Sequence, residues 1–220
     1  MPKNCFSVII AGGKGTRFWP LSRAHRPKQL LRIIGRKSLI AETAERTYPL
    51  SGRDRTLVIT LAGQVHALRR ELKDLPRNNF ITEPQGKNTA ACIGLAALEV
   101  VRRDPDATMV VLPADHWVRD RGAFRRALHS AIGLAMQLDR LVTIGISPEY
   151  PETGYGYIMK GKPVDGRTPA RSFVVKRFTE KPNLAAARQL VRRHGLWNSG
   201  IFGWKAGTPL RLLRPVQPAI

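Results

Sequence analysis

The sequence predicts an α/β protein built around a mostly parallel sheet, with a small α+β extension in its last third. Short apolar, β-prone runs alternate with segments of helical spacing from the N-terminus to residue 147. Beyond residue 147, glycine and proline crowd the chain, and the apolar runs alternate with polar residues as in antiparallel strands. Hydrophobic residues make up 43% of the 220 positions, enough to bury a core of this kind. We therefore divide the single expected domain into residues 1–147 and 148–220.

The expected elements follow from the local pattern in chain order. Apolar or β-branched runs predict strands in the first part at residues 6–10, 56–60, 80–82, 108–112 and 141–146. Helical spacing predicts helices between them at residues 38–46, 63–72, 89–103 and 122–138, and Ser38 is placed to cap the first. In the extension we expect strands at residues 155–160, 172–179 and 201–204, and a helix at residues 184–194. The alternation places helices on both faces of a parallel sheet.

Composition and cysteine usage exclude several classes of protein. No apolar run approaches the ~20 residues needed to cross a bilayer, and the first residues lack the pattern of a signal peptide. The two cysteines, Cys5 and Cys92, suit a reducing compartment and cannot build a disulfide framework. We expect a cytoplasmic protein that has no membrane partner.

The unusual property is a formal net charge of +21, from 37 basic and 16 acidic side chains. Such a charge attracts polyanions, including nucleic acid, phosphorylated metabolites and anionic membranes. The basic residues are spread along the chain without a basic tail, and no nucleic-acid recognition motif is present. We interpret the charge as an arginine-rich solvated surface and do not expect nucleic acid as a partner. The alternative predicts binding that weakens steeply with salt.

A glycine-rich turn follows the first predicted strand directly, at residues 11–17 (AGGKGTR). Glycines let the backbone approach a phosphate closely and turn its N–H groups toward it, while Arg17 adds a permanent charge with forked donors. Lys28 follows in the segment RPKQ and supplies a second cation. Phe18 breaks the dinucleotide-binding pattern GxGxxG, and the P-loop pattern is absent. The alternative interpretation is a tight turn with solvated charges.

Asp115 lies just past the end of the predicted strand 108–112, in the segment VVLPADH. In open α/β sheets, ligands bind at this edge of the strands. A carboxylate there suits Mg²⁺, which proteins hold through one or two carboxylates together with substrate phosphates. The alternative is an aspartate that caps the next turn or helix. We expect the neighbouring His116 to be structural.

Four further polar segments are weaker signals on their own. Residues 83–89 (EPQGKNT) suit contacts with a nucleobase and with phosphates at a helix start, or, alternatively, a plain helix cap at Asn88 or Thr89. The other segments combine acid, amide and lysine groups of the kind that bind a sugar phosphate, the last of them in an expected turn: residues 152–157 (ETGYGY), 178–182 (FTEKP) and 197–202 (WNSGIF). We find no nucleophile motif and no paired metal-ligand spacing.

Taken together and in this order, the motifs resemble the sugar-1-phosphate nucleotidyltransferases, and most closely their mannose-1-phosphate guanylyltransferase (GDP-mannose pyrophosphorylase) branch. The most specific block is residues 11–23 (AGGKGTRFWPLSR) followed by PKQ, and the segments NTA at 88–90 and WNSG at 197–200 support the same branch. The resemblance implies a Rossmann-like three-layer α/β/α (GT-A-like) nucleotidyltransferase fold. In that fold, residues 1–147 would bind the nucleotide, and residues 148–220 would form a C-terminally incomplete part that binds the sugar phosphate.

The resemblance also implies a reaction and a set of site residues. An oxygen of mannose-1-phosphate would attack the α-phosphorus of GTP in line, giving GDP-mannose and pyrophosphate without a covalent enzyme intermediate. The implied catalytic residues are Arg17, Lys28 and Asp115, with Asp115 also holding Mg²⁺. The implied nucleotide-binding residues are Ala11, Gly12, Gly13, Gly15, Thr16, Glu83, Asn88 and Thr89. The implied sugar-phosphate residues are Gly154, Glu180 and Asn198 on mannose and Lys181 on its phosphate. The implied partners are GTP and mannose-1-phosphate, with a second copy of the chain as a further candidate.

The sequence departs from the family in one respect. Family members continue past the equivalent of Phe202 and carry a second metal-binding aspartate there, so we expect this chain to be shortened and to lack that residue. One alternative is a catalytically impaired relative that binds a nucleotide or nucleotide sugar, or regulates a partner. Another is an enzyme for a different sugar phosphate or nucleotide, against which the mannose-type block at residues 19–23 argues.

Overall fold

The computed structural model describes residues 4–13, 15, 18–23, 26–86, 88–164 and 170–215. Its sheet has the order β3-β2-β1-β4-β8-β6-β7, with β5 paired to β8. The strands β1 to β4 are parallel, and they span Cys5–Ile10, Thr56–Leu61, Phe80–Glu83 and Thr108–Pro113. The strands β5 to β8 pair antiparallel, and they span Val142–Ile146, Tyr157–Pro163, Phe173–Thr179 and Leu196–Lys205. The predicted α/β class with a largely parallel central sheet is confirmed.

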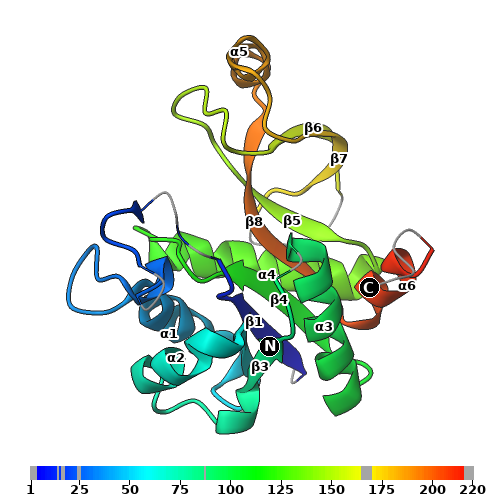
Figure 1. Cartoon of the computed structure of the whole chain (residues 1–220). Helices are drawn as coiled ribbons and strands as arrows, with labels where there is room; N and C mark the ends of the chain where they lie inside the picture. Colours follow the sequence, from blue (N-terminus) through cyan, green and yellow to red (C-terminus); the bar gives the residue numbers. More distant parts are fainter. Residues whose placement is uncertain are drawn as a thin grey trace.

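Helices cover both faces of the parallel strands (Figure 1). The helices α1 to α6 span Leu39–Ser51, Val65–Glu71, Asn88–Arg103, Arg121–Leu138, Leu184–Arg192 and Gly207–Leu213. Side chains of β1 alternate between the two faces, because successive strand residues point in opposite directions. Phe6 and Val8 pack against α3, whereas Ile9 packs against α1 and α2. The parallel pairing of β1 to β4 then places their carboxyl ends at the same edge.

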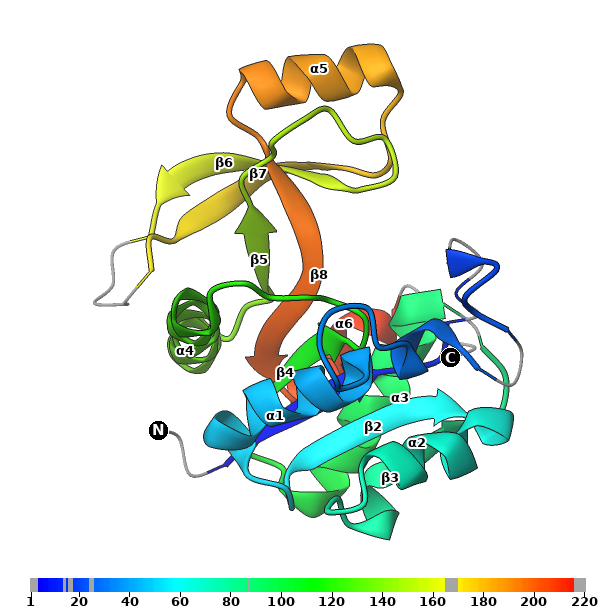
Figure 2. The ribbon, with the colours of Figure 1, turned by 90° about the vertical axis from the view of Figure 1, so that its left-hand side faces the viewer.

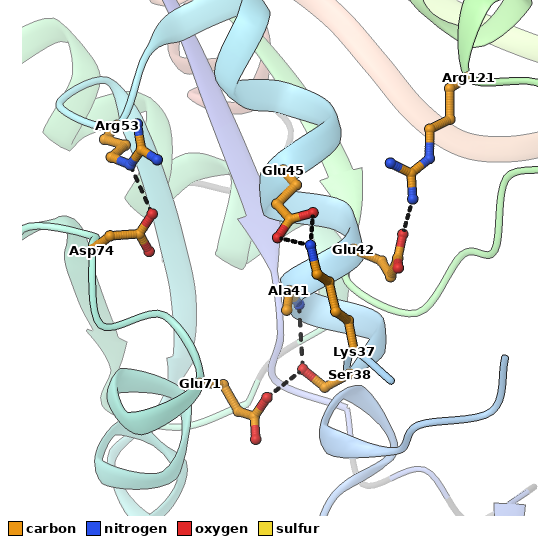
Figure 3. Close-up of polar contacts among 9 residues, drawn as sticks. All are labelled: Lys37, Ser38, Ala41, Glu42, Glu45, Arg53, Glu71, Asp74 and Arg121. Carbon is orange, nitrogen blue, oxygen red and sulfur yellow. Dashed lines mark hydrogen bonds and ion pairs between the residues drawn. The ribbon is translucent and has the colours of Figure 1, made fainter. Parts of the chain in front are cut away.

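Polar side chains determine where several helices begin. Ser38 caps α1 as predicted: its Oγ accepts a hydrogen bond from the backbone N–H three residues on and donates to Glu71 (Figure 3). Asp120 and Asn183 cap α4 and α5 in the same way. Helix α1 continues to Ser51 instead of ending at Arg46, although Pro49 lies in its last turn. The residues after Arg46 continue its buried face, and burial outweighs the single backbone hydrogen bond that a proline removes there.

The strands β6 and β7 and the helix α5 form an arm that projects from the core of the molecule (Figures 1 and 2). Strand β8 links the arm to the core. Trp197 at its start pairs with Tyr157 of β6, and Trp204 near its end pairs with Met109 of β4. A single strand therefore connects the arm with β4 in the core.

Two predictions for this region are wrong. The strand expected at residues 141–146 does not continue the parallel set, since β5 pairs antiparallel with β8. The turn expected at residues 197–202 lies inside β8, which is longer than the predicted strand 201–204. Both errors have one cause: β8 is stabilised by partners far away in the sequence, and a local pattern does not record such pairing.

The turn-forming residues in β8 produce a bulge. Opposite β5, Thr143 pairs with Phe202 and Gly145 pairs with Asn198, so β8 carries extra residues at this point. Gly200 supplies the backbone that the bulge requires, with φ of 69°. The glycine that suggested a turn therefore bends a strand. None of the helices in the described ranges combines the length and the apolarity that crossing a bilayer requires.

Candidate active site

The structure brings Asp115 and the glycine-rich turn to the same edge of the sheet. Strands β1 and β4 are adjacent and parallel, and Ile10 pairs with Pro113, so the two following segments leave the sheet side by side. Ala114 N donates to Ile10 O at 3.1 Å and keeps the segments together beyond the last paired residues. This is the edge where open α/β sheets bind their ligands.

Lys28 contacts Asp115 directly. Lys28 begins a short 3-10 turn, Lys28–Leu30, and its Nζ lies 2.5 Å from Asp115 Oδ2. The two side chains are 27% and 20% exposed, so one side of the pair faces solvent. A partly solvated ion pair of this kind contributes on the order of 1 kcal/mol. An incoming polyphosphate can therefore replace the carboxylate as the partner of Lys28 at little cost.

The glycines of the turn make room for Lys28. A Cβ on Gly15 would lie 2.7 Å from Lys28 Cβ, and a Cβ on Gly13 would lie 3.2 Å from Lys28 Cε. Gly15 also has a positive φ of 69°, and its carbonyl accepts from Ser22 Oγ at 2.6 Å and from Phe18 N at 2.9 Å. These glycines therefore leave room for Lys28, the lysine expected to be catalytic. This role is additional to the close approach to phosphate that the sequence predicted for them.

Gln29 is a site residue to which the sequence pattern assigned no role. Its side chain is fully buried, and its Nε2 donates to Ala11 O and, at 2.8 Å, to Gln64 Oε1. Thr60 Oγ1 also donates to Ala11 O, at 3.2 Å. The carbonyl at the start of the turn is thus held by two side chains, which fixes the backbone before the glycines. The available signal was the position of Gln29 directly after Lys28.

Glu83 is the buried acid of the site. It ends β3 and is 6% exposed, and burial raises the pKa of its carboxyl, partly offset by a hydrogen bond from the Cys92 thiol. Burial, with Glu83 adding to it, raises the pKa of Cys92 to about 12, so this thiol stays protonated. A Cβ on Gly12 would lie 2.9 Å from Glu83 Oε2, so the carboxylate lies against the turn. An acceptor oxygen of Glu83 therefore lies beside Gly12.

The remaining nucleotide-side residues stand apart from this contact network. Asn88 and Thr89 open α3 and are exposed, and Asn88 has a positive φ of 66°, a conformation that asparagine tolerates better than most residues. Arg17 and Thr16 lie outside the described residues.

The arm gathers the residues expected to bind the sugar phosphate around Gly156. A Cβ on Gly156 would lie 2.9 Å from Glu180 Oε2, and Gly156 O accepts from Asn198 N at 2.7 Å. Lys181 Nζ lies 3.0 Å from Glu180 Oε1, and both side chains are more than half exposed. Glu180 and the backbone of Asn198 therefore lie beside Gly156, and Lys181 lies beside Glu180, although these residues come from the end of β7 and from β8.

Asn198 and Gly154 are each held by a local hydrogen bond. Asn198 Oδ1 accepts from Thr143 Oγ1 at 3.0 Å, which orients the amide of a residue expected in a turn and found in β8. Gly154 N donates to Glu152 Oε1 at 2.7 Å, which closes the loop before β6. Both contacts fix backbone or side-chain direction next to Gly156.

Arg46 is a second residue that the sequence pattern missed. From the sequence, it resembles the many other arginines in helices. In the structure it is only 7% exposed and donates to His116 O, next to Asp115. The signal was its spacing from Leu39 and Thr43, which places it on the buried face of the helix. Burial also lowers the pKa of His116, so this imidazole is neutral near pH 7.

Asp115 is the carboxylate to which the sequence pattern assigned a metal ion. Among the residues that the structure describes, no three or more His, Cys, Asp or Glu side chains form a metal-binding group. A lone carboxylate fits Mg²⁺ that is held mainly by substrate phosphates and water. The donor set therefore suits an ion that arrives with a polyphosphate, and does not suit a permanent structural metal.

Comparison with known proteins identifies the family. Residues 6–218 match the family described as Nucleotidyl transferase, and the chain belongs to this family. It is 42% identical over 218 residues to the xanthan biosynthesis protein XanB of Xanthomonas campestris pv. campestris, covering 97% of this chain and 44% of the relative. It is 40% identical over 222 residues to the mannose-1-phosphate guanylyltransferase of Escherichia coli K12, covering 98% and 46%. The chain thus spans less than half the length of these relatives.

A solved structure supports the same fold. A Thermus thermophilus protein described as mannose-1-phosphate geranyltransferase superposes with a TM-score of 0.88 and 34% identity, covering 98% of this chain and 61% of that one. The predicted membership of the nucleotidyltransferases is confirmed.

Proposed function

We propose that the chain transfers a guanylyl group from GTP to mannose-1-phosphate and forms GDP-mannose and pyrophosphate. The observation that carries the proposal is the contact of Lys28 with Asp115 at the edge where the glycine-rich turn leaves β1. A cation, a carboxylate and a backbone that a phosphate can approach closely together suit a metal-bound polyphosphate. The name of the Escherichia coli relative supports the choice of substrates.

The reaction requires positioning and charge neutralisation from the protein. An oxygen of the sugar phosphate forms a bond to the α-phosphorus of GTP, and the bond from that phosphorus to the β-phosphate bridging oxygen breaks. Lys28 exchanges its contact with Asp115 for phosphate oxygens and offsets their charge. Asp115 would then hold a divalent cation, which nucleotidyl transferases generally use, and we propose that the ion is Mg²⁺. When bound, the ion polarises the phosphate under attack. Arg17 is the second proposed cation on the phosphates.

The pocket for the base is proposed at Glu83 and Gly12. A carboxylate accepts two hydrogen bonds and donates none, and guanine presents two neighbouring donors, N1–H and the N2 amino group. Adenine offers an acceptor at N1, so the same carboxylate disfavours it. Because burial raises the pKa of Glu83, a ligand that donates to the ionised form relieves the cost of keeping that form buried. Ala11, Gly13, Gly15, Thr16, Asn88 and Thr89 complete the proposed nucleotide site.

The sugar phosphate is proposed to bind at the group around Gly156. Glu180 and Asn198 supply acceptors and a donor for mannose hydroxyls, Gly154 supplies close backbone, and Lys181 pairs with the phosphate. The ion pair of Lys181 with Glu180 at 3.0 Å is exposed, so it is easily exchanged for a substrate contact.

A cellular setting follows from the proposed substrates. We place the reaction in the cytoplasm, where GTP and sugar phosphates are available, and we propose that GDP-mannose serves polysaccharide synthesis, since one relative is named for xanthan biosynthesis. A second copy of the chain remains a candidate partner.

The test is pyrophosphate release by the purified protein with Mg²⁺ and mannose-1-phosphate, offering GTP, ATP, UTP and dTTP separately. Release with GTP alone supports the proposal, and exchange of mannose-1-phosphate for glucose-1-phosphate tests the sugar. A second function, nucleotide binding without turnover, is favoured because no three or more His, Cys, Asp or Glu side chains gather as metal ligands among the residues that the structure describes. It predicts that GTP binds with no pyrophosphate released.

A further inference from the structure

We propose that Arg46 is a positioning residue that fixes the backbone beneath Asp115, an inference that rests on the proposed function of that aspartate. Arg46 Nη2 donates to His116 O at 2.8 Å and to Thr43 Oγ1 at 2.7 Å. Thr43 Oγ1 in turn donates to Leu39 O at 2.9 Å and lies 3.4 Å from Ala114 O. The carbonyls on both sides of Asp115 therefore face one pair of side chains on α1.

The burial of Arg46 argues that its hydrogen bonds matter. Burial lowers the pKa of the guanidinium to about 10, because the charge loses hydration there, and the charge of Glu42 offsets part of this effect. The nearest acid on the same helix, Glu42, makes its ion pair with Arg121 instead (Figure 3). Phe124 packs against the guanidinium, with 5.7 Å from Arg46 Cζ to the ring centroid. An apolar side chain would fill this space at lower cost. What arginine adds is its hydrogen bonds to Thr43 Oγ1 and to His116 O and its contact with the Phe124 ring, and the bond to His116 O is the one that reaches the Asp115 segment.

In the proposed reaction, the hydrogen bond from Arg46 to His116 O keeps the backbone at Asp115 in place. Asp115 is paired with Lys28 at 2.5 Å in the structure, and it has to exchange that partner for a divalent cation. Lys28 stands on the 3-10 turn after the glycines, whereas Arg46 reaches the Asp115 segment from α1. The backbone is thus held from an element that takes no part in the exchange. A carboxylate that keeps its place while its partner changes needs an anchor of this kind.

Arg103 offers a matched control. It is a partly buried helix arginine that donates to Asn79 Oδ1 at 2.7 Å and to Asn78 O at 2.8 Å, before β3. Those contacts lie at the amino ends of the strands, while Asp115 follows a carboxyl end. Arg103→Met therefore removes a partly buried guanidinium, its backbone contact and its ion pair with Glu99 without touching the Asp115 segment.

The experiment compares Arg46→Met, Arg46→Lys and Thr43→Val with Arg103→Met. Thermal melting first establishes that each variant folds, and Mn²⁺ titration in the presence of GTP, followed by electron paramagnetic resonance, then reports metal binding without turnover. We expect Arg46→Met to lower kcat about 10- to 100-fold with the KM for GTP nearly unchanged, and to weaken Mn²⁺ binding about tenfold. Arg46→Lys should retain part of the kcat and part of the Mn²⁺ affinity, because the lysine ammonium reaches one of the two acceptors, His116 O or Thr43 Oγ1. Arg103→Met lowers the melting temperature and leaves kcat and Mn²⁺ binding unchanged.

Wild-type kcat and Mn²⁺ binding in a folded Arg46→Met protein would overturn the inference, and so would equal losses in Arg103→Met. If Arg46→Met does not fold, Arg46→Lys and Thr43→Val decide, with the same expected direction and smaller losses. If the wild type releases no pyrophosphate, the proposed function fails, and crystal structures of wild type and Arg46→Lys still test the anchor. A shift of residues 114–116 in Arg46→Lys relative to wild type would support the proposed anchor. The same position of this segment in both structures would overturn it.

Discussion

Replacing Glu83 by glutamine should raise stability and lower activity in the same protein. Burial raises the pKa of the Glu83 carboxyl, so the folded state binds a proton more tightly than the unfolded state does. Stability therefore falls as pH rises from the unfolded pKa through the folded pKa. Glutamine removes that cost and keeps an oxygen to accept from the Cys92 thiol. We expect Glu83→Gln to melt at a higher temperature than wild type at pH 7.5, and the two melting temperatures to converge at acid pH.

The loss of activity follows from the proposed contact with guanine. A bidentate contact to a base edge contributes about 1–3 kcal/mol of discrimination, and a hydrogen bond to a charged group about 1.5–3 kcal/mol. Glutamine turns one acceptor into a donor that faces a guanine donor. A combined loss of about 3 kcal/mol corresponds to a roughly 100-fold lower kcat/KM for GTP, because 1.36 kcal/mol is tenfold in rate. The preference for GTP over ATP should shrink accordingly.

Pyrophosphate release with GTP and with ATP measures the activity, and thermal melting at pH 5 and pH 7.5 measures the stability. Glu99→Gln, on α3, is the control: hydrogen bonding from Arg102 lowers the pKa of Glu99, so its neutralisation should destabilise the protein at neutral pH and leave activity intact. If Glu83→Gln kept the ratio of GTP to ATP activity and melted like wild type at both pH values, the reasoning about this carboxylate would be refuted.

Three further predictions follow from single contacts. Gly15→Ala should lower kcat/KM about 10- to 100-fold by displacing Lys28. Gly52→Ala has open space around it and should show only the backbone cost of its φ of 70° and ψ of 176°, roughly 1–3 kcal/mol; equal activity in the two variants would count against the seat for Lys28. Asp115→Asn should lower turnover at least about 100-fold while the melting temperature changes little, and retained Mg²⁺-dependent turnover would remove Asp115 from the mechanism. Ser38→Ala should lower the free energy of unfolding by about 1 kcal/mol in urea, because α1 loses its cap, and an unchanged midpoint would exclude that role.

The local sequence pattern was sufficient to predict the edge of the sheet at which the site lies. The apolar runs that became β1 and β4 are followed at once by glycines and by Asp115, and parallel strands bring such following segments together. The family resemblance then supplied roles for Lys28 and Glu83, and the structure places both beside the turn.

Residues that act through distant contacts were not accessible to the same reasoning. Asn198 was expected in a turn because Asn-Ser-Gly is typical of turns, and only its pairing with β5 reveals a bulged strand. Arg46 looks like a solvated helix cation, since burial of a guanidinium depends on what packs above it. Gln29 acquires its function from the carbonyl of Ala11, which the chain brings to it by folding.

The most direct test of the proposed function is to observe the products. Phosphorus NMR of the purified protein with GTP, mannose-1-phosphate and Mg²⁺ should show GDP-mannose and pyrophosphate appearing in equal amounts, and Asp115→Asn should suppress both signals. A folded wild-type protein that binds GTP and leaves both substrates unchanged would contradict the proposed transfer reaction.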